Sequence, residues 1–434
     1  MTARVLSVLA FVALVAGCGL FDDEEILEGD RRPVRQAFGS DGTVAVERRP
    51  LPAPRAISDW TQTSGNATHN SGHLQGPTTL DLVWSEDAGT GTSDDSRITS
   101  PPVVTGGLVI TLDAAAELRA FDAQSGAERW RLDLVPNENE DGEEGFGGGI
   151  AAEDGVLYVT TGFGEVLAIR AEAGEIVWRR SFGAPFRAAP AVDRGVVLAV
   201  TRNSQAFGIA AADGQVLWRV QGVSADAGSL GGASPAIAGN AALIPFASGE
   251  LLAADLTTGR RAWGAVLTGG RRGLARAAIT DLTGDPVVVG PVAIVANQSG
   301  RIAAFEGSTG RRVWTRAIGS IGPIWAAGDT IFLVSDTAEL LRLDAGTGET
   351  LWQKLLPQFD DPEDREDPIA YSGPVLVSGR VIVTDSEGQI WSVDGETGEG
   401  EVAAEISGGA VTGPVVAGGT VYILSENAVL HAYR

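Results

Sequence analysis

The stretch Ala120-Phe-Asp-Ala-Gln-Ser-Gly126-Ala-Glu-Arg-Trp130 contains the pattern that decides the fold of this chain. A small residue is followed six positions later by a glycine, and four positions after that by a tryptophan. The same spacing recurs at Ala168/Gly174/Trp178, Gly208/Gly214/Trp218, Ala253/Gly259/Trp263 and Ala304/Gly310/Trp314, and in degenerate form at Arg342/Gly348/Trp352 and Ser392/Gly398/Val402. An internal repeat with a period of about forty-five residues is typical of a propeller or a solenoid.

Each copy of the pattern lies within a longer unit of short apolar runs. An apolar run such as Pro102-Val-Val precedes a turn with glycine, here Gly106-Gly107, and a β-branched run such as Leu108-Val-Ile-Thr-Leu follows the turn. Short runs of this kind, bounded by glycine turns, are typical of β-strands. One unit therefore predicts one four-stranded antiparallel blade.

The tryptophans of the repeat are interpreted as contacts between blades. We expect each indole to lie flat against the small residue and the glycine of the next blade's motif, where it loses about 200 Å² of exposed surface. Such burial contributes several kcal/mol at most. We therefore predict structural rather than cofactor-binding roles for Trp84, Trp130, Trp178, Trp218, Trp263, Trp314 and Trp352.

The two ends of the repeat region complement each other. Leu80-Asp-Leu-Val-Trp84 resembles the last strand of a unit that has no beginning, whereas Pro414–Arg434 is a unit that stops before its tryptophan strand. Pairing the two would leave no open sheet edge where the ring closes. The sequence thus predicts an all-β fold, an eight-bladed propeller over residues 60–434 whose last blade is completed by the N-terminal strand.

The first residues have the pattern of a secretory signal peptide. Arg4 is followed by an apolar run over residues 5–15 and by Ala16-Gly17-Cys18, and the run is too short for a membrane span. The end of this segment resembles a bacterial lipobox, which implies lipidation of Cys18, the only cysteine. By the same resemblance, glycine at position 19 favours the outer membrane. We predict a signal peptide over 1–17 and a flexible, charge- and proline-rich tether over 18–59; an ordinary signal peptide with an incidental cysteine is the alternative.

Composition argues against several functions. The net charge of −24 disfavours nucleic acid or anionic lipid as a partner of the bulk surface. The repeats hold no P-loop, nucleophile elbow or metalloprotease motif. His69 and His73 are four residues apart, but no third ligand is in view. We therefore predict no catalytic residue, no metal, no cofactor and no enzymatic activity.

One segment is basic within this acidic chain. Residues 256–320 hold nine arginines against Asp281, Asp285 and Glu306. Arginine suits protein interfaces because its planar fork pairs with carboxylates. One hypothesis is that the loop Gly264–Thr283 forms a partner-facing patch with Arg271, Arg272 and Arg276. The alternative is a scatter of surface arginines that reflects the composition.

The repeat pattern, as in Ala254-Asp-Leu-Thr-Thr-Gly-Arg-Arg-Ala-Trp263, is similar to that of quinoprotein-type propellers. With the lipobox, the tether and the stretch from Trp60 to His73, the chain resembles the BamB-type lipoproteins. That resemblance implies a non-enzymatic scaffold at the periplasmic face of the outer membrane, held there only by its lipid anchor. The scaffold would dock on the periplasmic domains of the central barrel subunit of the β-barrel assembly complex, and unfolded outer-membrane proteins would be further partners.

The same resemblance implies where the partner is contacted. The family's contact loops enter the fourth and fifth blades, and they correspond here to Gly228–Pro235 and Ile279–Pro286. Leu230 and Asp281 match the family pattern, with Arg276 as a neighbour. This chain departs from the family pattern at two positions: the arginine that usually follows the leucine is absent, and Thr283 replaces a second aspartate.

Two alternatives use the same fold. One alternative is a periplasmic propeller that scaffolds another envelope complex or binds another ligand. The dehydrogenases that use pyrroloquinoline quinone share the repeat, but they carry a vicinal cysteine pair under the quinone. This chain has no cysteine after Cys18.

Overall fold

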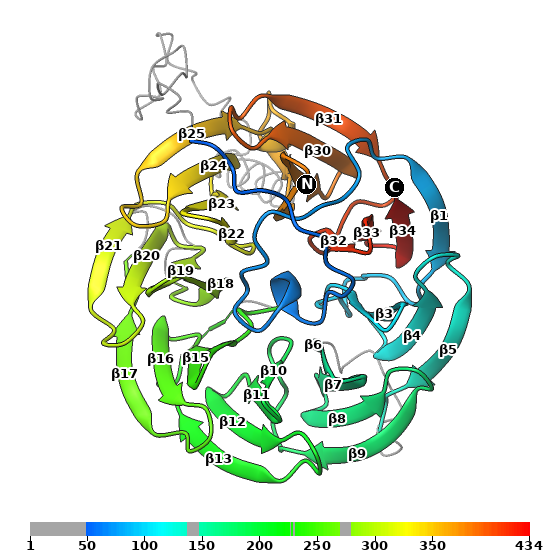
Figure 1. Cartoon of the computed structure of the whole chain (residues 1–434), viewed down its shortest axis with the longest axis vertical. Coiled ribbons are helices and arrows are strands. Elements are labelled where there is room, and N and C mark those ends of the chain that lie inside the picture. The colour runs from blue at the N-terminus through cyan, green and yellow to red at the C-terminus, as the bar shows by residue number, and fades with distance from the viewer. Residues whose placement is uncertain (1–48, 137–146, 226, 229–230, 270–278) are drawn as a thin grey trace, which may run out of the picture. The chain divides into compact units, whose positions relative to one another are not determined.

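The computed structural model describes residues 49–136, 147–225, 227–228, 231–269 and 279–434. These residues form eight four-stranded antiparallel sheets, the blades, arranged around a central axis (Figure 1). Blades 1 to 8 are numbered in chain order. The prediction of an eight-bladed all-β propeller is confirmed.

In blades 1 to 7 the strands run from the axis to the rim in chain order, and in blade 8 the outer strand is β1. Blades 1 to 4 consist of β2 (Val103–Thr105), β3 (Leu108–Leu112), β4 (Glu117–Asp122) and β5 (Glu128–Asp133); β6 (Gly148–Glu153), β7 (Val156–Thr161), β8 (Glu165–Arg170) and β9 (Glu175–Ser181); β10 (Ala191–Asp193), β11 (Val196–Val200), β12 (Gln205–Ala210) and β13 (Val216–Gln221); and β14 (Ala236–Ala238), β15 (Ala241–Pro245), β16 (Glu250–Asp255) and β17 (Arg261–Val266).

Blades 5 to 8 follow the same plan. They consist of β18 (Leu282–Val289), β19 (Val292–Asn297), β20 (Arg301–Glu306) and β21 (Arg312–Arg316); β22 (Trp325–Ala327), β23 (Thr330–Val334), β24 (Glu339–Asp344) and β25 (Thr350–Leu355); β28 (Tyr371–Val377), β29 (Arg380–Asp385), β30 (Gln389–Asp394) and β31 (Gly400–Glu405); and β32 (Val415–Ala417), β33 (Thr420–Leu424), β34 (Val429–Tyr433) and β1 (Leu82–Asp87). Two smaller elements lie outside the blades, the 3-10 helix η1 (Thr63–Gly65) and a hairpin of β26 (Phe359–Asp361) and β27 (Glu366–Pro368).

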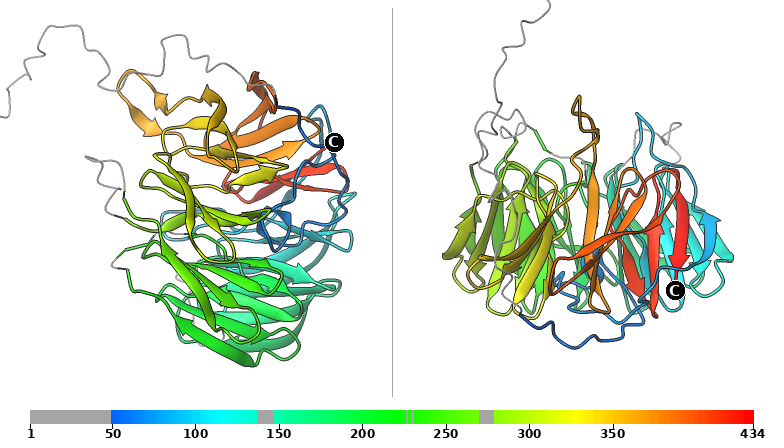
Figure 2. Two further views of the ribbon diagram at one scale, coloured as in Figure 1. Left: turned by 60° about the vertical axis from the view of Figure 1, so that its left-hand side comes forward. Right: turned by 90° about the horizontal axis from the view of Figure 1, so that it is seen from above.

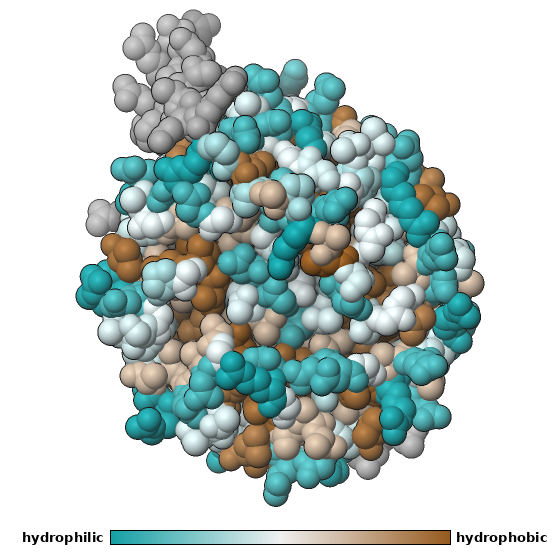
Figure 3. All heavy atoms as spheres, viewed as in Figure 1, coloured by the Kyte–Doolittle hydropathy of each residue, from teal (hydrophilic) through white to brown (hydrophobic). Residues whose placement is uncertain are grey.

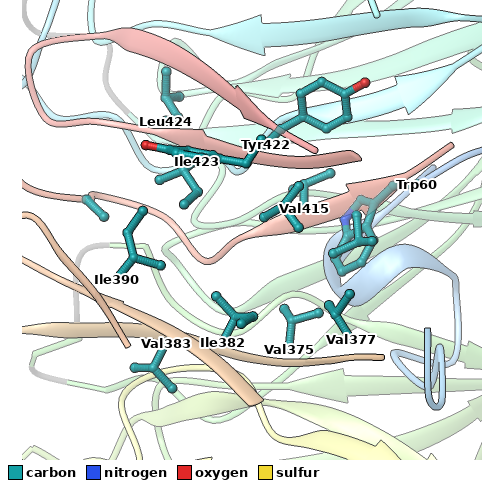
Figure 4. Packing of buried hydrophobic residues seen from close by; sticks show 14 of the residues in the cluster. Trp60, Val375, Val377, Ile382, Val383, Ile390, Val415, Tyr422, Ile423 and Leu424 are labelled. Atoms are coloured by element: carbon teal, nitrogen blue, oxygen red, sulfur yellow. The ribbon is translucent and has the colours of Figure 1, made fainter. Parts of the chain in front are cut away.

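Blade 8 closes the ring. Its outer strand β1 comes from the N-terminal part of the chain and pairs antiparallel with β34, with Trp84 opposite Ala432. The predicted closure is confirmed. In Figure 4, Tyr422 and Ile423 of blade 8 lie across from Ile382 and Val383 of blade 7, all of them within one buried apolar cluster.

The tryptophans join neighbouring blades, as predicted, but with a different division of roles. The glycine does come from the next blade: a Cβ at Gly174 would lie 2.8 Å from the ring of Trp130. The small residue, in contrast, belongs to the tryptophan's own blade, where Ala168 pairs across the strands with Trp178. The indole NH donates to a backbone carbonyl of the next blade, as from Trp130 Nε1 to Ala171 O at 2.9 Å.

The two degenerate copies have physical explanations. Arg342, in place of the small residue, is fully buried and donates to the carbonyl oxygens of Arg49 at 2.8 Å and Gly395 at 3.2 Å. Val402 replaces a tryptophan in blade 7, next to blade 8. There β34 and β1 pair without a connecting turn, so blade 8 has no glycine to receive an indole. A cavity of about 250 Å³ lies at this joint.

Residues 49–78, here called the hub segment, cross one face of the ring and bind all eight blades (Figures 1 and 2). The hydrogen bonds, in the order of the blades, involve Trp60 with Val104, Thr61 with Ala152, Gln62 with Val192, Ala67 with Ile237, Thr68 with Val288, Gly72 with Trp325, Leu74 with Leu376, and Ile57 with Gly418. Their lengths lie between 2.7 and 3.1 Å.

The hub segment corrects the predicted start of the propeller. Residues 49–59 are bound to the ring, through Arg49 to Asp344 and through Ile57 to Gly418, and are not part of a tether. The periodic pattern could not reveal this, because the segment pairs with eight different blades rather than with one neighbouring strand. The predicted signal peptide and the remainder of the tether, residues 1–48, lie outside the described residues.

Candidate functional site: the loop face

The two faces of the propeller differ. The hub segment binds the innermost strands toward their C-terminal ends, and the face that it covers mixes polar and apolar residues (Figure 3). The opposite face carries the loops that lead from the outer strand of one blade to the inner strand of the next; we call it the loop face. Figure 2, right, shows the hub segment below the ring and these loops above it. The hairpin β26–β27 belongs to the loop face.

A buried ion pair connects two blades on the loop face. Arg187 precedes β10 of blade 3, and its Nη2 lies 2.6 Å from Oδ1 of Asp281, which precedes β18 of blade 5. The Asp281 side chain is fully buried, and that of Arg187 is 5 % exposed. Because an isolated buried charge is costly, each side chain holds the other in place. The pair thereby spans the intervening blade 4.

The loop entering blade 4 packs onto this ion pair. A Cβ at Gly232 would lie 1.8 Å from Nη2 of Arg187, so a side chain there would have to displace the guanidinium from its position beside Asp281. On the other side, a Cβ at Gly228 would lie 3.3 Å from Oδ2 of Asp281. The backbone NH of Ser234 donates to Oδ1 of Asp285 at 2.7 Å. The loops entering blades 4 and 5 are therefore fastened together, and blade 3 supplies Arg187 to both.

A cavity of about 240 Å³ lies at the axis between these loops and the hub segment. Trp60 and Ser64 of the hub segment line it from one side. Residues in or just before the inner strands of seven blades line it from the other, among them Ile321 and Tyr371. Asp285 is the one charged residue that the described part of the chain contributes to its lining. Burial raises the pKa of the Asp285 carboxyl to about 7, although the Ser234 hydrogen bond and the Arg187 charge act in the opposite direction.

The structure brings together the two loops for which the resemblance implied partner contact. Asp281 lies in this cluster, but its side chain is buried rather than presented to a partner. Leu230 lies outside the described residues, between Gly228 and Gly231. Arg271, Arg272 and Arg276 of the predicted basic patch, and Cys18, also lie outside the described residues. Their predicted roles stay predictions.

The imidazole rings of His69 and His73 form hydrogen bonds with backbone groups. Nδ1 of His69 donates to the Pro286 carbonyl at 2.9 Å, and burial lowers the pKa of His69 to about 4. His73 donates from Nδ1 to Pro52 O and accepts at Nε2 from the NH of Gly379. Within the described ranges, no three or more His, Cys, Asp or Glu side chains are grouped to hold a metal ion.

Arg187 and Asp285 were missed by the sequence analysis. Arg187 is 94 residues from Asp281, and it follows an ordinary turn before a strand. Asp285 was counted only as one of three acidic residues in a basic segment. No local pattern marks either residue, because the ring brings their loops together only after it closes.

Comparison with known proteins agrees with this architecture. A family model described as "Outer membrane protein assembly factor BamB" matches residues 114–354 and 359–434. The protein of that name from Yersinia pestis is 25% identical over 98% of this chain and 97% of its own length. Two solved structures share the fold. BamB from Moraxella catarrhalis has a TM-score of 0.68 at 20% identity, over 82% of this chain and all of that one. Quinohemoprotein alcohol dehydrogenase from Comamonas testosteroni has a TM-score of 0.66 at 13% identity, over 87% of this chain and 80% of that one.

The structural likenesses alone do not separate an assembly factor from a dehydrogenase, since one fold hosts many functions. The family model matches residues in most of the eight blades and is described as that of an assembly factor. Among the described residues, no helix has the length and apolar content needed to cross a membrane. The chain belongs to the BamB family of outer membrane protein assembly factors.

Proposed function

We propose that this protein is a non-enzymatic scaffold of the outer-membrane β-barrel assembly machinery, and that it docks through its loop face on the periplasmic domains of the central barrel subunit. The family match over residues 114–354 and 359–434 carries the proposal. The name of the related proteins describes an assembly factor, and a rigid ring with one free loop face suits a scaffold.

The loop face is the better docking surface for physical reasons. The opposite face is crossed by the hub segment, whose hydrogen bonds to all eight blades would have to be broken to make room. Loops on a rigid scaffold are the usual position of binding residues. Ile321, 59% exposed at the mouth of the cavity, offers an apolar contact there.

Asp281 acts in this proposal through the loops that it holds. Its buried pair with Arg187 sets the position of the loop that contains Leu230, because Gly228 and Gly232 pack against the two charged side chains. Replacing Asp281 would then weaken partner binding without removing a direct contact. The basic loop with Arg271, Arg272 and Arg276 is proposed to add charge complementarity on the same face.

The protein is proposed to be held at the periplasmic face of the outer membrane by a lipid on Cys18. The segment between Cys18 and Arg49 would serve as the tether. The lipid would be its only attachment to the membrane, because the chain's strong negative charge disfavours contact with anionic lipid.

The outer strands are not proposed as sites for adding a substrate strand. Each shifts its register by one residue beside the tryptophan position, as where Trp178 pairs with Ala168 and Ile176 with Ile169, leaving Val177 unpaired. The other shifts lie in β1, β5, β13, β17, β21, β25 and β31. Bulged edges are poor templates for strand addition. Unfolded outer-membrane proteins, if bound, are expected at the loop face.

Affinity purification tests the proposal. A tagged form of the full-length chain is recovered from detergent-solubilised envelope, and its partners are identified by mass spectrometry. We expect the central barrel subunit, and we expect Arg187→Ala to reduce its recovery at least tenfold while Arg170→Ala, a change to an exposed ion pair, leaves it unchanged. Recovery of an unrelated envelope complex would reject the assembly role and leave the fold intact.

A further inference from the structure

The axial cavity combines one negative charge with aromatic walls. Its lining includes Trp60, Trp325 and Tyr371, and among the described residues Asp285 is the one charged member of the lining. Trp60 and Trp325 are stacked, with ring centroids 5.7 Å apart and planes inclined by 12°. Aromatic faces attract cations, most strongly where water is excluded.

Asp285 has no ion-pair partner among the described residues. Its carboxylate accepts one hydrogen bond, from the NH of Ser234. Arg187, whose charge acts on Asp285, forms its ion pair with Asp281 at 2.6 Å. A carboxyl group that is partly removed from water and has no counter-ion among the described residues is less favourable in its charged form, and groups of this kind cluster at functional sites.

Two further polar atoms of the lining lack partners within the described part of the chain. The indole Nε1 of Trp60 and the hydroxyl of Thr412 are buried and make no hydrogen bond there. Both residues line the cavity. The cavity thus has one acceptor that carries a charge and two more polar groups that a ligand or its water could satisfy.

We propose that this cavity binds a lysine ammonium or an arginine guanidinium presented by the protein that docks on the loop face, with Asp285 as its counter-ion. This inference rests on the docking proposed above, and it specifies which side chain of the partner would enter the cavity in the loop face. A long aliphatic stem with a cationic head fits the cavity, because the stem packs on the aromatic walls while the head reaches the carboxylate.

The first test uses small probes and needs no partner. N-acetyl-lysine methylamide and N-acetyl-arginine methylamide are titrated into the ¹⁵N-labelled propeller, and the backbone amide signals of Ser234 and Thr283 are followed. N-acetyl-norleucine methylamide is the neutral control, and calcium chloride tests for a simple cation site. We expect saturable shifts with the two cationic probes only.

Variants identify the counter-ion. Asp285→Asn is expected to weaken binding of both cationic probes at least tenfold, and Asp285→Glu to retain part of it. Asp360→Asn removes an exposed carboxylate from the β26–β27 hairpin on the same face and is expected to change nothing. Equal binding of the norleucine probe, or unchanged binding by Asp285→Asn, would overturn the proposal.

A different outcome is that an arginine of the same chain occupies the cavity. If the cationic probes bind only after Arg271, Arg272 and Arg276 are changed to Gln, the cavity takes a guanidinium from the same chain, and the proposal is wrong. A second test measures the affinity of the central subunit's periplasmic domains, which Asp285→Asn is expected to lower tenfold relative to Asp360→Asn. Probe binding without partner binding would reject the docking while the cation site stands.

Discussion

The two faces of the ring are held by different kinds of contact. On the hub face, hydrogen bonds of 2.7 to 3.1 Å, most of them between backbone groups, join one continuous segment to every blade. On the loop face, the corresponding positions of blades 3 to 5 are held by the Arg187–Asp281 ion pair. A cavity lies at the axis there, and the carboxylate of Asp285 in its lining has no ion-pair partner among the described residues. The contacts on the hub face therefore stabilise the ring, whereas the loop face contains a carboxylate whose burial lowers stability. Such destabilising features are expected mainly at functional sites.

The largest effect is expected on the hub face. Trp60→Ala should lower the free energy of unfolding by about 3–5 kcal/mol, because the indole is 3% exposed and its stacking on Trp325 would be replaced by a void. Chemical denaturation measures the change. Ile321→Ala on the loop face, where the side chain is 59% exposed, should cost under about 0.5 kcal/mol. Equal losses at the two positions would remove the contrast between the faces.

The next effect concerns the buried ion pair. Arg187→Ala should cost about 3 kcal/mol, because the fully buried Asp281 would lose its ion pair with this cation. Arg170→Ala, whose partner Glu175 is 3.7 Å away and exposed, should cost under about 0.5 kcal/mol. A double-mutant cycle of Arg187→Ala with Asp281→Asn should give a coupling of about 1–3 kcal/mol. Additive effects would show that the pair does not hold the loops.

A change of opposite sign is expected at Asp285. Its folded-state pKa, near 7, lies above the unfolded value of 3.8, so the folded state holds the proton to higher pH. The stability contribution of this group is therefore lost as the pH rises from about 4 to 7. Asp285→Asn should raise the free energy of unfolding by about 1–2 kcal/mol at pH 8 and by almost nothing at pH 4. The increase at pH 8 is smaller than the full pKa shift would give, because the carboxyl is partly solvated. Thermal melts of the two forms at both pH values measure it. A destabilised variant at pH 8 would mean that the carboxylate is already paired.

The smallest effect is expected in the β26–β27 hairpin, which projects from the loop face with exposed residues throughout its turn. Replacing Glu363 and Arg365 by Ala should change the free energy of unfolding by less than about 0.5 kcal/mol. Denaturation under the same conditions as for Trp60→Ala makes the comparison direct. A larger loss would place part of the ring's stability in this insertion.

Periodic features of the chain were predictable, and features of the closed ring were not. The Gly174 and Trp178 spacing predicted the blades, and the unmatched strand at Trp84 predicted how the ring closes. The small residue that pairs with each tryptophan was predicted to come from the next blade, but it belongs to the tryptophan's own blade. The spacing of the motif alone does not show which residues pair across the strands. The hub segment, the Arg187–Asp281 pair and the cavity with Asp285 depend on contacts between distant blades, and no local pattern encodes them.

Site-specific photo-crosslinking in the intact envelope tests the central claim most directly. A photoreactive residue is placed at Ile321 on the loop face or at Ala56, an exposed position of the hub segment. The scaffold account predicts a crosslink from position 321 to the central subunit of the β-barrel assembly machinery, and none from position 56. A crosslink to that subunit from position 56 alone would contradict docking through the loop face.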